Sequence, residues 1–405
     1  MINRKKFDFV LAAYLVLLIL FGCLAIFSAS TTHIGEYVST QNHWWKQLIF
    51  AVVSLGMMFL LMRLPMPIFD LIIIPAYILN ILALMAVLFA PEVSGAHRWF
   101  NFFGLHYQPS ESAKLFTVLI VARTISRENM SEIRQILYGF GLVILPVILI
   151  MLEPDFGSTL VFMFSLVAML IAADVPLLYI LLLISPVVSV LSSLWWPAII
   201  IWIIVLVGLL LWNRLSWITT AIAGILNGFL ALIMPVFWNS MKDYQQGRIG
   251  SFLNPMADPL GAGYQIIQAK IAVGSGSIAG KGWLQGTQKN MNFLPEHHTD
   301  FIFSVIGEEF GFIGALILLT LFVLFFWRLI RAVGEIRVGE RRIASAGILS
   351  YLMFQTFINI SMNIGLVPAT GIPLPFISYG GSNLLFNTLG VGVVLKYLNE
   401  RGFMK

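Results

Sequence analysis

Residues 242–311 read KDYQQGRIGSFLNPMADPLGAGYQIIQAKIAVGSGSIAGKGWLQGTQKNMNFLPEHHTDFIFSVIGEEFG. They form a long polar, glycine-rich stretch in a chain that is otherwise apolar enough for lipid. Connections of this length between membrane spans are uncommon unless they are functional or disordered. Regularly spaced apolar residues such as Ile266, Val273 and Leu284 argue against disorder. We therefore expect residues 240–302 to form a large ordered loop that carries the chemistry, with the rest of the chain as its scaffold.

The composition excludes a soluble globular protein. Of the 405 residues, 59% are hydrophobic and 11% are charged, whereas about 25% are charged in an average soluble protein. The net charge of +5 does not indicate nucleic-acid binding, because the basic residues lie in short connections between apolar segments. The single cysteine, Cys23, excludes an internal disulfide and a cysteine-based metal site.

Twelve apolar segments are long enough to cross a membrane as helices, and we expect one integral membrane domain over residues 1–405. The first segment follows MINRKKFDF without a small-residue cleavage site, so it is expected to be a retained span. The predicted spans lie near residues 8–28, 46–63, 70–90, 110–126, 137–153, 158–173, 177–194, 196–212, 217–239, 303–327, 344–366 and 382–398.

The positions of lysine and arginine predict the orientation of these spans. With both ends in the cytoplasm, 16 of the 24 basic residues fall on the inner side and 8 on the outer side. Five of those 8 lie in the long loop, which the positive-inside rule hardly weighs. The outer side then holds five polar stretches, namely residues 29–45, 91–109, 153–157, 240–302 and 367–382.

Asp300 is the leading candidate for chemistry in the long loop. It immediately precedes the apolar run 301–303, so we expect it where a helix enters the membrane. A carboxylate there is partly desolvated, which suits a general base. An aspartate that only satisfies the start of a helix explains the position equally well. Glu308 and Glu309 lie two turns further along, at a depth where ionisable groups usually face a cavity or a partner.

Two further pairs of residues lie in the other outer stretches. Glu111 and Lys114 stand three residues apart on one face of the predicted fourth span. A structural ion pair is the favoured interpretation, and a role in lining the same cavity stays open. Arg98 and Trp99 suit a diphosphate or sugar ligand, because a guanidinium binds phosphate and an indole stacks on sugar. An interfacial anchor explains them as well, and is favoured on the residues alone.

Two remaining features give weak signals. Glu153 and Asp155 flank a proline at the outer mouth of a span, but two carboxylates without a third ligand are poor support for a metal. Lys281 lies in GSGSIAGKG, which lacks the spacing of a phosphate-binding P-loop. Backbone amides in that stretch could still hold phosphate.

Seven stretches together resemble one family. HRWF, QPSESAK and EPDFGST, then DPLGAGYQIIQAKIAVGSG, GKGWLQGTQ and FLPEHHTDFIFSVIGEEFG, and finally TGIPLPFISYGGS, are similar to signatures of the SEDS family (shape, elongation, division and sporulation), in the same order. The resemblance covers most of the chain. GKGWLQGTQ favours the elongation branch over the division and sporulation paralogues, which stay as alternatives.

The resemblance implies a fold and an activity. The fold would be an all-α polytopic bundle with ten core spans, to which residues 175–213 add a helical hairpin. The activity would be that of a peptidoglycan glycosyltransferase in the bacterial cytoplasmic membrane. It would polymerise lipid II, an undecaprenyl-diphosphate-linked disaccharide peptide, on the outer face, with a class B penicillin-binding protein that crosslinks the strands.

The resemblance also assigns residues. Asp300 matches the essential aspartate, and we hypothesise that it accepts the proton of the acceptor sugar 4-hydroxyl as that oxygen attacks the anomeric carbon of the donor. No cofactor is assigned with certainty, and a divalent cation, Mg²⁺ or Mn²⁺, stays open with its ligands unassigned. The family's loop tryptophan falls on Trp99, and its buried Glu–Lys pair falls on Glu111 and Lys114. From the residues themselves we add five further candidate substrate-binding residues, namely Arg98, Lys270, Lys281, Asp155 and Glu308.

Two other classes of protein compete with the enzyme. A lipid II flippase would line its path with Glu111, Lys114, Glu308 and Glu309 and use Asp300 as a gate. A scaffold that only activates a partner synthase would make polymer formation depend on the partner's own active site and not on Asp300.

Overall fold

The computed structural model describes residues 7–34, 37–40, 42–91, 97–102, 105–127, 130–193, 195–213, 217–240, 246–247, 250, 252, 254–259, 261, 263–290, 298–337 and 339–400. The predicted loop 240–302 is covered in part, since residues 241–245, 248–249, 251, 253, 260, 262 and 291–297 lie outside these ranges.

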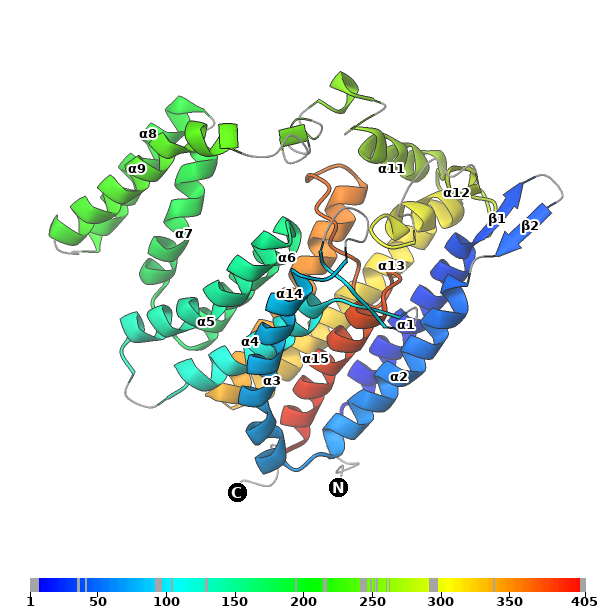
Figure 1. Ribbon diagram of the computed structural model, residues 1–405, viewed down its shortest axis with the longest axis horizontal. Helices are drawn as coiled ribbons and strands as arrows, with labels where there is room; N and C mark the ends of the chain where they lie inside the picture. Colours follow the sequence, from blue (N-terminus) through cyan, green and yellow to red (C-terminus); the bar gives the residue numbers. More distant parts are fainter. Residues whose placement is uncertain are drawn as a thin grey trace. The chain divides into compact units, whose positions relative to one another are not determined.

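Each predicted span coincides with a helix (Figure 1). The long helices are α1 (Phe9–Ser30), α2 (His43–Arg63), α3 (Met66–Val87), α4 (Pro109–Ile125), α5 (Glu132–Leu152), α6 (Phe156–Ala172), α7 (Leu177–Ser192), α8 (Trp196–Trp212), α9 (Trp217–Ser240), α13 (Ile302–Glu335), α14 (Glu340–Asn363) and α15 (Gly381–Glu400). By length and composition, six of the described helices could cross a membrane, namely α1, α2, α3, α5, α13 and α14. The all-α polytopic fold predicted from the composition is therefore confirmed.

The connections carry short elements only. The two antiparallel hairpins are β1 (Thr31–Ile34) with β2 (Tyr37–Thr40) and β3 (Phe100–Phe102) with β4 (Leu105–Tyr107). The described part of the long loop contains the 3₁₀ turn η1 (Pro255–Ala257) and the helices α11 (Tyr264–Ser275) and α12 (Thr287–Asn290).

The chain divides into two compact units. One contains residues Met1–Ala173 and Ser251–Lys405, and the other contains Asp174–Gly250. The second unit includes the predicted hairpin 175–213 as α7 and α8, and α9 packs with both. Hydrogen bonds between polar side chains connect its three helices. Within lipid, such bonds help to hold helices together, because the hydrophobic effect does not drive their association there. The bonds run from Ser189 Oγ to Asn227 Oδ1 (2.6 Å), from Asn227 Nδ2 to Ser185 Oγ (3.0 Å) and from Trp202 Nε1 to Ser189 Oγ (2.9 Å).

In the first unit, α1 begins and α15 ends at the same end of the bundle (Figure 1). Ion pairs connect elements at this end. Asp8 caps α1 and lies 2.8 Å from Arg328 of α13, and Arg341 of α14 lies 3.8 Å from Glu400 of α15. The long loop therefore belongs to the opposite end, where α13 begins.

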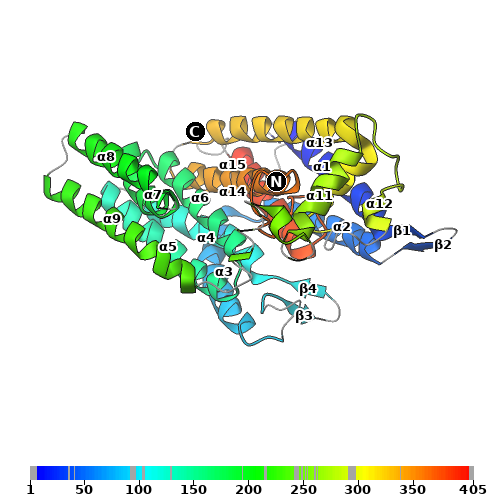
Figure 2. The same cartoon turned by 90° about the horizontal axis from the view of Figure 1, so that it is seen from above.

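Helix α13 is broken at Gly311, whose φ of 63° and ψ of −160° lie outside the helical region. A side chain at this φ is strained, which favours glycine. Backbone groups of α13 that lose their helical partners at the break form hydrogen bonds with the segment 277–282 of the long loop. Figure 2 shows α11 beside this part of α13. The bonds are Lys281 N to Glu308 O and Gly282 N to Glu309 O (3.0 Å each), Phe312 N to Ser277 O (2.9 Å) and Ile313 N to Ile278 O (3.1 Å).

Candidate active site

Asp300 lies just before α13, as the sequence predicted, and its side chain is half-buried. The residue at the helix N-cap is Phe301, and the amide of Ser304 in the first turn donates to Asn363 Oδ1 of α14 at 3.0 Å. A side chain from another helix thus binds one amide in the first turn of α13. This arrangement weakens the interpretation of Asp300 as a helix cap.

The carboxylate of Asp300 faces the loop that connects α14 and α15. An ideal Cβ on Gly371 would lie 3.5 Å from Asp300 Oδ2. The same loop contacts the start of α6, because a Cβ on Gly157 would lie 2.6 Å from the carbonyl oxygen of Thr370 and 2.8 Å from Cγ1 of Ile372. Two glycines therefore allow the Asp300 segment, the 370–372 segment and the 153–157 turn to approach one another closely.

Asp155 is buried at the start of α6 and caps this helix. It accepts hydrogen bonds from the amide of Ser158 at 3.2 Å and from Ser158 Oγ at 2.8 Å. Gln108, which directly precedes α4, donates at 3.5 Å to Asp155 Oδ2, the oxygen that also accepts from Ser158 Oγ. The predicted site residue is therefore brought to the start of α4, which carries the next predicted pair.

Glu111 and Lys114 form the predicted ion pair, with 2.7 Å between Lys114 Nζ and Glu111 Oε1. The exposed fractions of the two side chains are 3% and 2%, so the pair is shielded from solvent. Asn383 of α15 donates to Glu111 Oε2 at 3.1 Å. Of the three donors that a lysine ammonium has, one is used in this pair, which leaves hydrogen-bonding capacity for a ligand.

Arg98 binds the turn between α5 and α6. Its Nε donates to the carbonyl oxygen of Glu153 at 2.8 Å, and its Nη2 donates to the carbonyl oxygen of Pro154. Trp99 is half-buried and contacts His106 of β4 edge to face, at 6.2 Å between ring centroids. Two donors of the guanidinium are thus used to hold the turn that contains Asp155.

Glu153 in this turn has an unusual environment. Its side chain is fully buried, and within the described part of the chain neither carboxylate oxygen has a hydrogen-bond partner. Burial raises the pKa of Glu153 to about 9; the charge of Asp155 adds to the rise and Arg98 opposes it. Glu153 therefore carries a proton at neutral pH. The described ranges contain no group of three metal-ligating side chains, and a divalent cation stays a prediction.

Lys281 and Glu308 form a separate cluster at the break in α13. Lys281 Nζ lies 2.7 Å from Glu308 Oε1, and Glu308 is fully buried. The amide and hydroxyl of Thr287 donate to the same oxygen, at 2.9 and 2.8 Å. Beside it, the buried Lys289 lies 2.5 Å from Glu309 Oε1.

Hydrogen bonds from Lys289 to Ser28 of α1 complete this cluster. Lys289 Nζ donates to the carbonyl oxygen and to Oγ of Ser28, at 2.8 and 2.7 Å. The two ion pairs therefore clamp the long loop onto α13 and α1. The carboxylate of Glu308 is already bonded to loop residues on several sides, so its contacts are those of a structural group.

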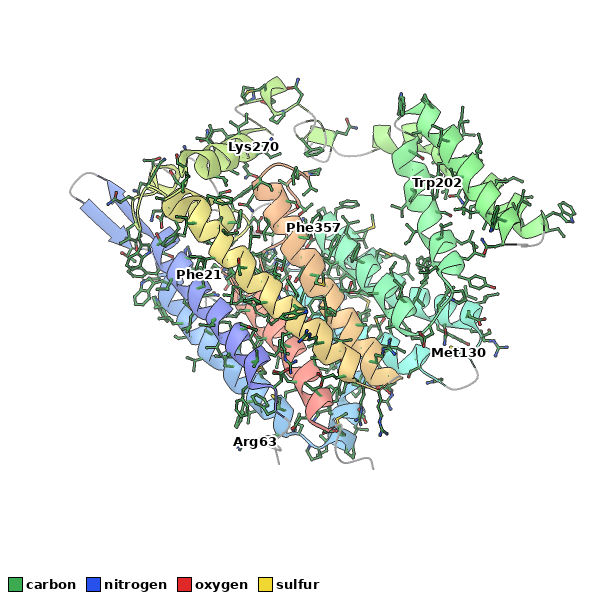
Figure 3. The ribbon with its side chains drawn as sticks, turned by 180° about the vertical axis from the view of Figure 1, so that it is seen from behind. Phe21, Arg63, Met130, Trp202, Lys270 and Phe357 are labelled. Carbon is green, nitrogen blue, oxygen red and sulfur yellow. The ribbon has the colours of Figure 1, made fainter. Side chains whose placement is uncertain are left out.

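Lys270 differs from the other predicted cations. It is exposed on α11, and in the described ranges no carboxylate lies within ion-pair distance of it. A Cβ on Gly365, at the end of α14, would lie 1.8 Å from Lys270 Cε. The preceding residue, Ala269, packs against Phe301 and Ala369, next to Asp300. Figure 3 shows Lys270 at the end of the first unit opposite to Arg63.

Sequence reasoning missed several residues that build this site. Asn359 and Asn363 of α14 donate to the backbone carbonyl of Asp300 at 2.9 and 3.0 Å. A signal for them was present, because two asparagines four residues apart share one face of an apolar span. Gly371 had no such signal, since its role depends on a contact between segments far apart in the chain.

Comparisons with known proteins give a consistent result. The family of cell cycle proteins FtsW, RodA and SpoVE matches residues 9–199 and 196–401. The chain is 33% identical to the peptidoglycan glycosyltransferase MrdB of Escherichia coli K12, over 98% of this chain and 97% of the relative. It is 30% identical to the peptidoglycan glycosyltransferase RodA of Treponema pallidum, over 98% of both chains. It is 31% identical to a probable peptidoglycan glycosyltransferase FtsW of Trichlorobacter lovleyi, over 96% and 92%.

Solved structures share the fold. A chain from a peptidoglycan synthase complex, described as coordinating polymerisation and crosslinking, matches with a TM-score of 0.72 and 28% identity over 98% of both chains. The rod shape determining protein RodA of Thermus thermophilus matches with a TM-score of 0.64 and 23% identity over 99% of both chains. At that identity, the second match supports the fold alone.

Proposed function

The chain belongs to the FtsW/RodA/SpoVE family of cell cycle proteins and is a peptidoglycan glycosyltransferase, and we propose that it polymerises lipid II with Asp300 as the general base. The observation that carries this proposal is the position of Asp300, half-buried and adjacent to Gly371 at the end of the bundle that holds the long loop. A carboxylate that is partly desolvated and rigidly held meets the requirements of a general base.

The reaction needs one proton transfer and one displacement. Asp300 takes the proton of the 4-hydroxyl of the acceptor sugar while that oxygen attacks the anomeric carbon of the donor. The bond from this carbon to the lipid diphosphate breaks, and the diphosphate leaves with the electron pair. Because the diphosphate is already a good leaving group, the protein contributes mainly by positioning two substrates and stabilising negative charge.

Lys270 is the cation best suited to the diphosphate. Lys281 and Lys114 are each within 2.7 Å of a carboxylate, and Arg98 donates to two carbonyl oxygens. Lys270 is exposed and next to the Asp300 segment, so its ammonium is available to a ligand. Lys114 and Glu111 would contact polar groups of the sugars from the side of α4. No step of this mechanism is assigned to a divalent cation.

The charge distribution supports the proposed orientation of the enzyme in the membrane. Asp8, Arg328, Arg341 and Glu400 lie at the end of the bundle where the chain begins and ends, and most basic residues belong to that side. This supports a cytoplasmic location for both termini in a bacterial cytoplasmic membrane, with Asp300 on the outer face. A class B penicillin-binding protein is the proposed partner, supported by the similarity to a chain from a synthase complex.

A polymerisation assay in detergent tests the proposal. Purified wild-type protein and Asp300→Asn are given lipid II, with and without the partner. We expect the variant to lose about 10²- to 10⁴-fold in rate, the usual contribution of general-base catalysis. Asp174→Asn is the matched control, because this exposed aspartate lies in a turn of the other unit with a φ of 60°, which asparagine tolerates.

The same assay separates the competing classes. A flippase yields no glycan polymer in detergent, and a scaffold yields polymer that depends on the partner's active site. Normal polymerisation by Asp300→Asn would remove this residue from the role of base.

A further inference from the structure

The three residues of the segment 298–300 have all of their backbone carbonyls bound by the C-terminal part of the chain. The bonds come from Tyr379 N to His298 O (2.9 Å), from Ser378 Oγ to Thr299 O (2.6 Å), and from Asn359 Nδ2 and Asn363 Nδ2 to Asp300 O (2.9 and 3.0 Å). The carbonyl of Asp300 thus receives two donors, both from buried side chains of α14. Fixing a carbonyl fixes its peptide plane, and with it the direction in which the Asp300 side chain leaves the backbone.

Asn359 bridges the two backbone segments on either side of the carboxylate. Its amide nitrogen donates to the carbonyl oxygen of Asp300 at 2.9 Å and to that of Ile372 at 2.8 Å. Ile372 directly follows Gly371, the residue that Asp300 Oδ2 faces. One side chain therefore holds the carbonyl oxygens of Asp300 and Ile372 at a fixed separation.

Asn363 connects Asp300 to the first turn of α13. Its Nδ2 donates to the carbonyl oxygen of Asp300, and its Oδ1 accepts from the amide and the hydroxyl of Ser304, at 3.0 and 2.6 Å. The side-chain amide of Asn363 therefore binds both the backbone amide of Ser304 and the carbonyl of Asp300. Asn363 Nδ2 also donates to Asn359 Oδ1 at 3.3 Å, which links the two side chains.

Two asparagines in an apolar helix are costly unless their polar atoms are bonded. Here both amide nitrogens donate to the Asp300 carbonyl, and both side chains are fully buried. A general base must lie within hydrogen-bond reach of the proton that it takes, and an error of about 1 Å can cost 10²-fold in rate. The hydrogen bonds of Asn359 and Asn363 restrain the backbone of Asp300 and thereby oppose such a displacement of its carboxylate.

We infer that Asn359 and Asn363 are positioning residues for Asp300, because together they bind its carbonyl and connect it to the 370–372 segment and to α13. This inference rests on the proposed function of Asp300. Neither asparagine contacts the reacting atoms in this arrangement, so they act through the aspartate.

The test uses the full-length protein in detergent with lipid II as substrate. Asn359→Ala and Asn363→Ala are expected to lower kcat by about 10- to 100-fold, with KM for lipid II within about twofold of wild type. Asn363→Asp keeps the acceptor for Ser304, removes the donor to Asp300 and adds a buried carboxylate beside that carbonyl, so its loss should be at least as large as that of Asn363→Ala. Asn227→Ala, a buried asparagine of the other unit, is the matched control and should retain its rate.

A double-mutant cycle distinguishes positioning from general stability. In an Asp300→Asn background, removal of either asparagine should cause no further loss of the residual rate, because the group that they position is absent. Hydrogen exchange over residues 298–304 provides a second measurement that is independent of activity. Exchange in this segment should rise in both alanine variants and stay unchanged in Asn227→Ala.

Three results would contradict the inference or its premise. Equal losses in the two backgrounds would mean that the asparagines only stabilise the fold. Unchanged exchange over residues 298–304 would mean that they do not hold the segment. Full activity of Asp300→Asn would overturn the proposed function instead, and the exchange data would then decide separately whether the two side chains anchor the backbone.

Discussion

A side chain on Gly371 would begin 3.5 Å from the Oδ2 atom of Asp300. Alanine fits that space, at a conformational cost of about 1–2 kcal/mol, because the φ of Gly371 is +74°. Leucine would extend over the carboxylate and displace the acceptor sugar. We expect Gly371→Leu to lose at least about 100-fold in polymerisation and Gly371→Ala to lose much less, as measured with lipid II in detergent. Equal rates for the two variants would show that the acceptor sugar does not reach the carboxylate from the side of Gly371.

Glu111 and Lys114 test whether a buried ion pair is structural or functional. Lys114→Met should destabilise the protein by about 3–5 kcal/mol, because it leaves a buried carboxylate without its cation. The double variant Glu111→Gln/Lys114→Met should recover most of that stability, measured by thermal unfolding in detergent. If the pair also contacts substrate, the double variant will fold and still polymerise slowly. A wild-type rate would assign the pair to the fold alone.

Glu153 should make stability depend on pH. Its pKa is raised to about 9 in the folded state, from 4.5, so the folded protein binds a proton that the unfolded chain releases. The contribution of Glu153 to stability should therefore be fully present below pH 4.5 and be lost as the pH rises toward 9, by up to about 1.4 kcal/mol per pH unit. Thermal unfolding at pH 6 and pH 8 should show this fall in wild type and a smaller one in Glu153→Gln. The opposite slope, or the same slope in both proteins, would count against a protonated Glu153.

The two ion pairs at the break in α13 should differ in their effect on stability. Lys289 and Glu309 are fully buried, so Lys289→Met should cost about 3–5 kcal/mol and expose the long loop to protease. Lys281 is 28% exposed, and solvent screening should make Lys281→Met milder. Unfolding temperatures and limited proteolysis of both variants provide the measurement. A larger loss of stability in Lys281→Met than in Lys289→Met would contradict this assignment. A raised KM for lipid II without loss of stability would support a role of Lys281 in substrate binding.

Lys270 should affect substrate binding without affecting the fold. Because it is exposed, Lys270→Ala is expected to leave the unfolding temperature unchanged while lowering kcat/KM, and Lys270→Arg should restore part of the activity. Gly365→Ala is a useful companion, since a Cβ there would lie 1.8 Å from Lys270 Cε and would move the ammonium. Wild-type kinetics for Lys270→Ala would exclude the lysine from diphosphate binding.

Some of the site was visible in the sequence because it depended on local spacing. Glu111 and Lys114 pair within one turn of α4, and Asp300 directly precedes α13, as their positions along the chain predicted. Lys281 and Glu308 are 27 residues apart, and their pairing followed from no local rule. Their bond depends on the break in α13 and on the loop segment that fills it.

The membrane-spanning helices could be predicted from the amino-acid sequence, because twenty apolar residues in a row need lipid around them and must satisfy their backbone groups internally. The sequence also determined the family, through motifs whose order is a property of the chain. The contacts around Asp300 depend on how the helices pack: Asn359 and Asn363 bind its carbonyl, and Gly371 lies next to its carboxylate. Such contacts join segments about 60–70 residues apart, and hydrogen-bond geometry across that separation is fixed by helix packing and not by any pattern within one segment.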